Sequence, residues 1–541
     1  MKDREIYSQW LESMPKNSDE YQQLINLSEQ EIKENFHKDI HFGTGGIREL
    51  MGLGSNRLNV FTVRKVAKGY SNYLIEKFHH DIKVCIAYDN RNNSYQFAME
   101  MAKVLSSNNI KCYIFDSLRP TPELSFALRY LNCSGGIVIT ASHNPKEYNG
   151  IKIYDEYGCQ CVPRDTDVIA DHIKAVKNIF EIVTDVSNHT ISSITQEVDE
   201  AYYRALEGIQ EYPEMIKNIK IVYSPLHGTG FIPVTHMLTK LGYDLEVVAE
   251  QCNPDVNFSN TESINPENQK SFIKAVALAK QVKADLVMNT DPDCDRIGLV
   301  VLHNGEYRYL TGNQTGAIFL YYLLNEKKKK NTLPDDAVVY NTIVTSDLGT
   351  RICADFGVKV ISTLTGFKFI GDKIRELEDE STFLFGYEES YGYLIKDICR
   401  DKDGVQAAIL SAEICNFYKS KKKTLIDVLE EIYKKYGYVE DIQENETLLG
   451  LKGEKLIHKK INEFRKGDIK QLEGRNVVAK EDYLYSIRYE GSKKTKLKLP
   501  KSNVIKFILD DGSWVVVRPS GNEPKIKYYK NLWCNPKMED K

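Results

Sequence analysis

The sequence lacks the features that would place it in a membrane or on a nucleic acid. No run of about 18 apolar residues, the length of a membrane-spanning helix, occurs in it. Residues 1–5 lead into no apolar segment of the kind found in secretory signal peptides. The 72 lysines and arginines nearly balance 76 acidic residues, for a net charge of −4, so no general positive field attracts nucleic acid or anionic lipid. We therefore expect a cytoplasmic protein that binds neither.

Cysteine is present, but it is not organised. Eleven cysteines, an odd number at irregular spacing, form no disulfide framework in a chain of this length. Cys159 and Cys161 lack the partners of a zinc site. Reduced thiols are the simpler interpretation, and they agree with a cytoplasmic location.

The chain is too long for one hydrophobic core. Single cores stop growing at about 250–300 residues, so 541 residues predict three or four domains. Strand-like runs such as residues 84–88 alternate with helical periodicity, as at residues 63–78 and 96–105, which is typical of α/β domains. The alternation restarts at residues 219–223 and 337–340, although the sequence shows no internal repeat.

Two polar stretches and one change of texture mark the predicted domain boundaries. Residues 211–217 and 327–336 precede the restarts, and the lysines of the second stretch favour a solvated linker. Beyond about Lys435, an amphipathic helix near residues 454–464 and strand-like pieces such as residues 503–507 predict a smaller α+β domain. We expect domains at 1–212, 213–315, 316–437 and 438–541.

One serine is predicted at the edge of a sheet where ligands collect. Ser142 and His143 lie in residues 140–145 (TASHNP), directly after the apolar run 136–139. That run predicts a buried strand, so Ser142 should stand at its carboxyl end, where ligands of open α/β sheets bind. An ordinary turn is as good an interpretation of the pair alone. Three other segments favour a functional site.

Three aspartates alternate after the strand-like run 285–289. Asp291, Asp293 and Asp295 are followed by Arg296. Like charges about 4 Å apart repel by roughly 1 kcal/mol in water and about 4 kcal/mol at an effective dielectric near 20, so the loop favours a cation. Oxygen ligands without histidine or cysteine at matching spacing favour Mg²⁺ over zinc. The alternative is a solvated acidic turn.

Two further segments carry hydrogen-bonding groups that suit sugar hydroxyls and phosphate. Residues 385–392 (FGYEESYG) follow a strand-like run and place Glu388 and Ser390 between glycines, although a helix N-cap or polar turn is the alternative. Residues 518–527 form either a plain surface turn or a site for a phosphate dianion. The donors of that site would be Arg518, Ser520, Gly521 and Asn522.

In this order, the four segments resemble the signature loops of the α-D-phosphohexomutase family: the phosphoserine, metal, sugar and phosphate loops. The resemblance covers nearly the whole chain. It implies three similar α/β domains with mixed sheets and a smaller α+β domain, with one loop from each facing a central cleft. Further matches lie at residues 42–48, 88–91, 119–122, 149–152, 223–228 and 365–368.

The resemblance implies an isomerase that moves phosphate within a sugar. Phosphorylated Ser142 would give its phosphoryl group to one end of a sugar monophosphate, the bisphosphate would turn over, and the other phosphate would return to Ser142. One Mg²⁺ per chain is implied, because a phosphoserine of charge about −1.5 to −2 beside three aspartates requires a divalent cation. Its ligands would be Ser142, Asp291, Asp293 and Asp295.

The family's motifs suggest roles for the remaining candidates. Three residues match positions that orient groups or exchange protons near the reacting oxygen: Lys152, Arg296 and Lys368. His143 is a further candidate proton carrier, because the usual pKa of histidine suits that role. The alternative for each of the three cations is a surface charge, and for His143 a role in orienting the loop. Seven residues match substrate-binding positions: Arg48, Glu388, Ser390, Arg518, Ser520, Gly521 and Asn522.

The chain also departs from the family's motifs. Asn522 stands where threonine is usual, although an amide still donates a hydrogen bond to phosphate. Glu49 follows Arg48 where a glycine or alanine is common. Residues 264–267 read INPE in place of PNPE. The difference at Asn522 bears on affinity rather than on the reaction.

Within the family, residues 386–392 and 400–404 look most like the phosphoglucomutase and phosphopentomutase branch. This implies interconversion of α-glucose 1-phosphate and glucose 6-phosphate, with glucose 1,6-bisphosphate as intermediate and activator. Phosphopentomutase and phosphomannomutase activities by the same mechanism are the alternatives. A serine/metal phosphatase or a non-catalytic sugar phosphate sensor fits less well. The partners implied are sugar phosphates, and the expected assembly is a monomer or a weak homodimer.

Overall fold

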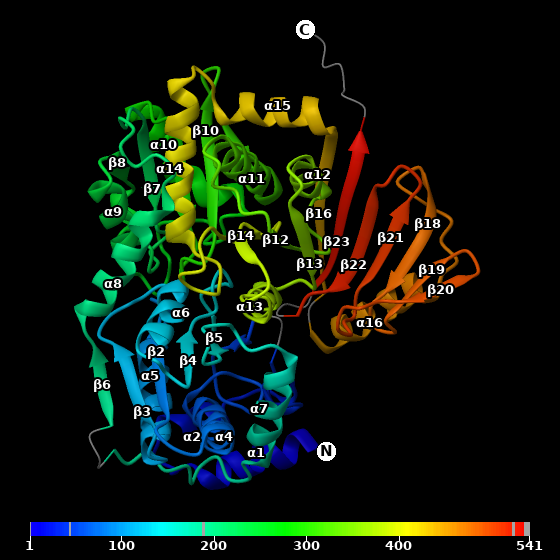
Figure 1. Ribbon diagram of the computed structural model, residues 1–541. Coiled ribbons are helices and arrows are strands. Elements are labelled where there is room, and N and C mark those ends of the chain that lie inside the picture. The colour runs from blue at the N-terminus through cyan, green and yellow to red at the C-terminus, as the bar shows by residue number, and fades with distance from the viewer. Residues whose placement is uncertain (1, 43–44, 187–189, 449, 522–524, 535–541) are drawn as a thin grey trace.

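The computed structural model describes residues 2–42, 45–186, 190–448, 450–521 and 525–534 (Figure 1). These residues form three α/β domains and a β-rich C-terminal domain, which stands beside the third. The fold class predicted from the sequence is confirmed, with mixed sheets in the first three domains and an α+β domain last. Among the described helices, none is both long enough and apolar enough to span a bilayer.

Three short helices precede the first sheet and pack on other parts of the first domain. They are α1 (Lys2–Ser13), α2 (Asp19–Ile25) and α3 (Glu29–Phe36). Trp10, Leu24 and Phe36 are buried between them, and the rings of Phe61 and Phe180 from the first domain complete the cluster. The carboxyl end of α3 is thereby fixed beside the first sheet.

The first domain holds a six-stranded sheet in the order β1-β5-β4-β2-β3-β6. Helices cover both faces, so its central strands are apolar on both sides. Ile86 and Ile137 face α4, α5 and α7, whereas Cys85 and Val138 face α6 and α8. The elements are β1 (Ile47–Leu50), α4 (Val60–Phe78), β2 (Lys83–Tyr88), α5 (Ser94–Ser107), β3 (Lys111–Phe115), α6 (Thr121–Tyr130), β4 (Gly135–Ile139), β5 (Tyr148–Tyr154), α7 (Pro163–Ala175), β6 (Ile191–Ile194), α8 (Gln196–Leu206) and the 3₁₀ turn η1 (Glu207–Ile209).

The second domain repeats the central arrangement of the first. Its sheet order is β11-β10-β9-β7-β8. As β2 does with β3 and β4, β7 pairs in parallel with the next two strands, and the third strand then pairs antiparallel with a fourth. The elements are β7 (Lys220–Ser224), α9 (Phe231–Lys240), β8 (Asp244–Val247), η2 (Ala249–Gln251), η3 (Gln269–Phe272), α10 (Ile273–Val282), β9 (Leu286–Thr290), β10 (Ile297–His303) and β11 (Glu306–Leu310).

The third sheet, in the order β13-β12-β14-β15, has the same pattern. The structure thus shows a threefold similarity that the sequence does not reveal. The elements are α11 (Gly312–Lys329), β12 (Ala337–Thr342), α12 (Asp347–Asp355), β13 (Lys359–Thr363), α13 (Phe367–Glu376), β14 (Thr382–Tyr387), β15 (Tyr393–Leu394), α14 (Gly404–Ser420) and α15 (Leu425–Tyr436).

The lysine-rich stretch before the third sheet is not the expected linker. Residues 327–329 form the last turn of α11, because its apolar face continues through Leu323 and Leu324 into a core shared by the second and third domains. Lys327 and Lys330 form ion pairs with Glu211, and lysines at a helix carboxyl end suit the helix dipole. The boundaries predicted after residues 212, 315 and 437 stay predictions.

The C-terminal domain is an eight-stranded sheet with one helix. α16 packs Ile457 and Ile461 on one face, while Trp514 and Tyr529 on the other face contact the third domain. The elements are β16 (Tyr438–Thr447), α16 (Gly450–Lys466), β17 (Gln471–Leu472), β18 (Arg475–Asp482), β19 (Ile487–Glu490), β20 (Lys493–Lys496), β21 (Ile505–Leu509), β22 (Trp514–Pro519) and β23 (Lys525–Cys534).

Candidate active site

Three of the predicted loops leave corresponding strands of the three similar sheets. The Ser142 loop follows β4, the aspartate loop follows β9, and the Glu388 loop follows β14, each before the antiparallel strand. Each loop contains a residue other than glycine in the left-handed region: Ser142 (φ 51), Cys294 (φ 53) and Tyr391 (φ 68). Such backbone costs free energy and persists only where its surroundings hold it. In this structure, hydrogen bonds within and between the domains hold the loops.

Ser142 is buried with its hydroxyl against the second domain. Its Oγ donates to Asp291 Oδ2 at 2.7 Å and lies 3.1 Å from Nδ1 of His143. Only 1% of the residue is exposed. Burial and the nearby cations Arg296 and Arg48 lower the pKa of His143 well below its usual value, so the imidazole is neutral.

The buried guanidinium of Arg91 fixes the main chain of the Ser142 loop. Arg91 donates to the main-chain carbonyls of Ser142 and Asn144, and to those of Pro145 at 2.8 Å and Tyr148 at 3.0 Å. Asp89 Oδ2 accepts the hydroxyl proton of Thr140 at 2.6 Å, and Thr140 Oγ1 accepts the backbone N–H of Ser142 at 2.7 Å. These contacts fix the serine before any ligand arrives.

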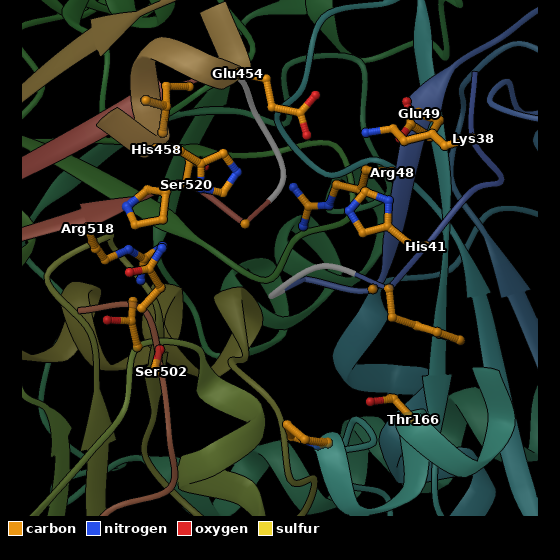
Figure 2. A pocket seen from close by; sticks show the side chains of 18 of the residues that line it. Lys38, His41, Arg48, Glu49, Thr166, Glu454, His458, Ser502, Arg518 and Ser520 are labelled. Carbon is orange, nitrogen blue, oxygen red and sulfur yellow. The ribbon is translucent and has the colours of Figure 1, made fainter. Parts of the chain in front are cut away.

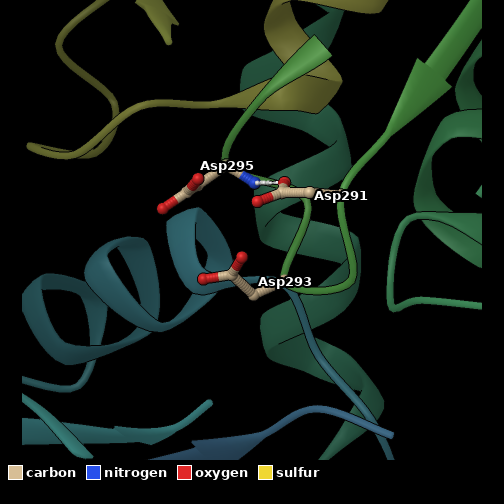
Figure 3. Close-up of side chains that lie close together, drawn as sticks. All are labelled: Asp291, Asp293 and Asp295. Carbon is tan, nitrogen blue, oxygen red and sulfur yellow. Dashed lines mark hydrogen bonds between the residues drawn. The ribbon is translucent and has the colours of Figure 1, made fainter. Parts of the chain in front are cut away.

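Three carboxylates of the second domain meet beside that hydroxyl. Asp291, Asp293 and Asp295 are at most 1% exposed, and one oxygen of each lies within 4.8 Å of the others (Figure 3). Lys152 Nζ lies 2.7 Å from Asp293 Oδ2 and 2.8 Å from Asp295 Oδ2, and Lys402 Nζ lies 3.0 Å from Asp295 Oδ2. The cluster therefore contains negatively and positively charged side chains, and these come from three domains.

The pKa values in this cluster move in opposite directions. Burial raises the pKa of Asp291 well above its usual range, and the charges of Asp293 and Asp295 add to the rise. Burial also opposes ionisation of Asp295, yet Lys152 and Lys402 bring its pKa well below the usual range. The two lysines thus keep one part of the cluster ionised.

The donor set fits a magnesium ion. All three aspartates offer hard oxygen ligands, which Mg²⁺ prefers. Oδ1 of Asp293 and Oδ1 of Asp295 are buried and accept no hydrogen bond from the described residues. Buried carboxylate oxygens without a partner are costly, and a divalent cation would remove that cost.

The main chain of the Glu388 loop lies next to that of the aspartate loop. Ile297 N donates to Tyr391 O at 3.1 Å, and Arg296 forms a β-bridge with Gly392. Glu388 is 4% exposed and accepts the N–H of Gly366 at 2.9 Å, whereas Ser390 is half-buried. Two of the predicted sites are therefore neighbours.

A cavity of about 960 Å³ separates the first and third domains from the C-terminal domain. Arg48 and Lys368 line it on one side, and Arg518, Ser520 and Gly521 on the other. Figure 2 shows the side chains of Arg48 and Arg518 on facing walls, with His41 and Lys38 beside Arg48 and with Glu454 and His458 on the wall of α16. Asn522 lies outside the described residues.

The burial and hydrogen bonding of Arg518 suit the binding of an anion. The residue is only 7% exposed, and its Nε has no hydrogen-bond partner among the described residues. A buried guanidinium binds phosphate oxygens strongly and often two at a time. The cavity wall therefore has the chemistry of a phosphate site.

Comparison with known sequences identifies the family. The Phosphoglucomutase/phosphomannomutase alpha/beta/alpha domains I, II and III match residues 39–179, 200–305 and 311–436. The chain belongs to the phosphoglucomutase/phosphomannomutase family. Its members are phosphohexomutases, which are isomerases, so the resemblance noted from the motifs is confirmed.

Relatives and solved structures agree with this family. The chain is 38% identical over 525 residues to phosphoglucomutase of Staphylococcus epidermidis, covering 94% of each chain. It is 39% identical over 520 residues to phosphoglucomutase of Staphylococcus aureus, covering 95% of this chain and 93% of that one.

The crystal structures share the fold at lower identity. A putative phosphomannomutase of Thermus thermophilus has a TM-score of 0.68 at 20% identity, over 92% of this chain and 96% of that one. The phosphoglucomutase parafusin of Paramecium has a TM-score of 0.66 at 20% identity, over 93% of each chain.

Three residues of this phosphohexomutase support the site without having been singled out from the sequence: Arg91 binds the Ser142 loop, and Lys402 and Thr121 contact the aspartates. All three lie within matches to the family's motifs, Arg91 at residues 88–91, Thr121 at 119–122 and Lys402 at 400–404, but none was given a role. Thr121, at the N-terminus of α6, donates its hydroxyl proton to Asp293 Oδ2 at 2.8 Å. The available signal was position, because each of the three follows a strand or opens a helix at the carboxyl edge of a sheet.

Proposed function

We propose that this protein is a phosphoglucomutase that interconverts α-glucose 1-phosphate and glucose 6-phosphate. One observation carries the proposal: the Ser142 hydroxyl of the first domain donates to Asp291 of the second at 2.7 Å, inside a buried group of three carboxylates. A serine placed in this way can carry a phosphoryl group beside a bound cation. Relatives 38% and 39% identical over most of the chain bear the name phosphoglucomutase.

The residues around Ser142 suit phosphoryl transfer. Lys152 and Arg48 surround the place where charge develops on the phosphoryl oxygens, and cations fixed there before the reaction stabilise the transition state. Asp291 accepts the serine proton in the hydrogen bond between them, while neutral His143 orients the hydroxyl. Asp291, Asp293, Asp295 and the oxygen on Ser142 would hold one Mg²⁺, which neutralises phosphate charge when bound.

The cavity suits the other end of the substrate. Arg518 and Ser520 would bind the phosphate that does not react, while Glu388 and Ser390 would bind ring hydroxyls. The cavity volume of about 960 Å³ is at the upper end of the roughly 300–1,000 Å³ usual for ligand pockets, so it has room for a sugar phosphate. Ser142, the three aspartates, Glu388 and Ser390 are not among the described residues that line it. Glucose 1,6-bisphosphate would also phosphorylate an empty Ser142, so a trace of it should activate the enzyme.

A substrate panel tests the proposal. Glucose, mannose, N-acetylglucosamine, ribose and deoxyribose 1-phosphates are compared by kcat/KM with Mg²⁺ and a trace of the matching bisphosphate. We expect glucose 1-phosphate to give the highest value and glucose 6-phosphate to be the product. A pentose phosphate in first place would overturn the choice of sugar but not the mutase reaction. Release of free phosphate as the main product would indicate a phosphatase instead.

A further inference from the structure

The main chain of Arg296 is fixed between two loops of the site. Its N–H donates to Asp291 Oδ1 at 3.0 Å, and its β-bridge to Gly392 ties it to the sugar loop. The long side chain is not fixed by these bonds. The position of the guanidinium therefore depends on which carboxylate binds it.

Several acids compete for that guanidinium. Its Nε lies 3.9 Å from Asp295 Oδ1 without a hydrogen bond, and the charges of Asp291 and Glu388 also act on it. Its Nη1 instead pairs with Glu267. Glu267 belongs neither to the aspartate cluster nor to the sugar loop, so it draws the guanidinium away from both.

Glu267 is itself held in place before any substrate binds. Asn265 Oδ1 accepts the N–H of Glu267 at 3.0 Å, and Asn265 O accepts that of Asn268 at 2.9 Å. The loop lies against β10 where Gly298 has no side chain, since a Cβ there would come within 2.9 Å of Pro266 O. The carboxylate thus projects from a rigid turn.

We propose that Glu267 is a positioning residue, which keeps the Arg296 guanidinium from hydrogen-bonding to Asp295 and Glu388. This inference rests on the proposed function, in which Asp295 binds the cation and Glu388 binds the sugar. Without Glu267, the cation on Arg296 pairs with the nearest remaining carboxylates and competes with Mg²⁺ or with a ring hydroxyl. Misplacement of a catalytic group by about 1 Å can cost roughly 100-fold in rate.

The kinetic test is a double-mutant cycle with Glu267→Gln and Arg296→Ala. We expect Glu267→Gln to lower kcat by about 10- to 100-fold while KM changes little. In the Arg296→Ala background the same substitution should have no further effect. Losses that simply multiply would show that Glu267 does not act through Arg296. The matched control is Glu262→Gln in the preceding turn, since Glu262 is exposed and pairs with Lys270 at 3.4 Å; it should leave kcat unchanged.

Two measurements decide the role of Glu267 without turnover. A crystal structure of Glu267→Gln should show the guanidinium moved onto Asp295 or Glu388, and calorimetry should show weaker Mg²⁺ binding than in the unsubstituted protein. An unmoved guanidinium together with unchanged Mg²⁺ affinity would overturn the inference. Absence of mutase turnover in the unsubstituted protein would instead overturn the proposed function and leave these two measurements decisive. Thermal unfolding confirms that each variant is folded.

Discussion

The region around Ser142 and the C-terminal wall of the cavity are the two ends of the proposed site. They differ in how many of their polar groups are buried and bonded to other domains. Around Ser142, the aspartates are at most 1% exposed, and Lys152 and Thr121 bond to them across domains. On the C-terminal wall, Gly521 is exposed, Ser520 is half-buried, and Arg518 Nε has no partner among the described residues. The proposed reacting end is preorganised by bonds across the domains and leaves Oδ1 of Asp293 and of Asp295 for a cation, whereas the C-terminal wall is more exposed and, in our proposal, receives a phosphate. Changes at the first should therefore act mainly on kcat, and changes at the second on KM as well.

The largest effect should come from the serine. Ser142→Ala removes the group that would carry the phosphoryl, and we expect kcat to fall by roughly a million-fold, the order seen when a covalent nucleophile is removed. Steady-state kinetics with glucose 1-phosphate measures this. Intact-mass analysis should also show phosphate on the unsubstituted protein and none on the variant. The control Ser117→Ala alters an exposed serine of the same domain, and phosphate that survives Ser142→Ala would refute the assignment.

Removing one carboxylate should cost less, because the cluster keeps two. Asp293→Asn leaves the pair of Lys152 with Asp295 in place, and we expect a loss of about 4 kcal/mol of transition-state stabilisation, or roughly 1,000-fold in kcat. Activity titrated with Mg²⁺, and abolished by a chelator, provides the measurement. Asp244→Asn on the exposed edge of β8 is the control. Full activity of either protein in excess chelator would count against a metal site.

Substitutions on the C-terminal wall of the cavity, the open end of the proposed site, should affect the kinetics differently. Arg518→Ala removes charged hydrogen bonds to the non-reacting phosphate, and we expect kcat/KM to fall by about 100-fold, with KM rising and kcat falling together. Arg488→Ala, in an ion pair with Glu481 elsewhere on the same sheet, should change neither. A change in kcat alone would mean that Arg518 belongs functionally to the reacting end, and the contrast between the two ends would disappear.

The strands and the loops after them could be predicted from the sequence, but the contacts between domains could not. Residues 136–139 and 286–288 are without charged or strongly polar side chains because helices cover both faces of their sheets, and these residues lie within β4 and β9. Carboxyl ends of parallel strands collect ligands, so Ser142 and Asp291 were expected at the sheet edges. The approach of these two edges to 2.7 Å depends on how whole domains pack, which no local pattern records.

The same limit explains the errors and omissions. The lysines at residues 327–329 looked like a linker because charge runs usually are solvated, yet the apolar face of α11 continues beneath them. Arg91 belonged to a motif match without an assigned role, and its role is visible only once it donates to four carbonyls at residues 142–148. In both cases, packing distant in sequence decided the outcome.

The smallest expected effect is a pH dependence of kcat/KM, which tests whether Lys368 contributes to phosphate binding at the open end. Burial lowers the pKa of Lys368 to about 8 against the opposing charge of Asp167. The charged form, which attracts a phosphate, exists below that pKa, so kcat/KM should fall about tenfold between pH 7 and pH 9. In the unfolded chain the Lys368 side chain keeps a pKa near 10.4. Between pH 7 and pH 9 the unfolded state therefore binds more protons at Lys368 than the folded state does. Stability should therefore rise with pH across this window.

A guanidinium at the same position separates the charge of Lys368 from other causes of that pH dependence. In Lys368→Arg the side chain stays charged to high pH, and the fall in kcat/KM near pH 8 should disappear. Lys373→Arg, on the exposed side of the same helix, should retain it. A fall near pH 8 that persists in Lys368→Arg would assign the titration to another group. Lys368 would then line the cavity without binding the phosphate, and the non-reacting phosphate would be bound by the C-terminal wall alone.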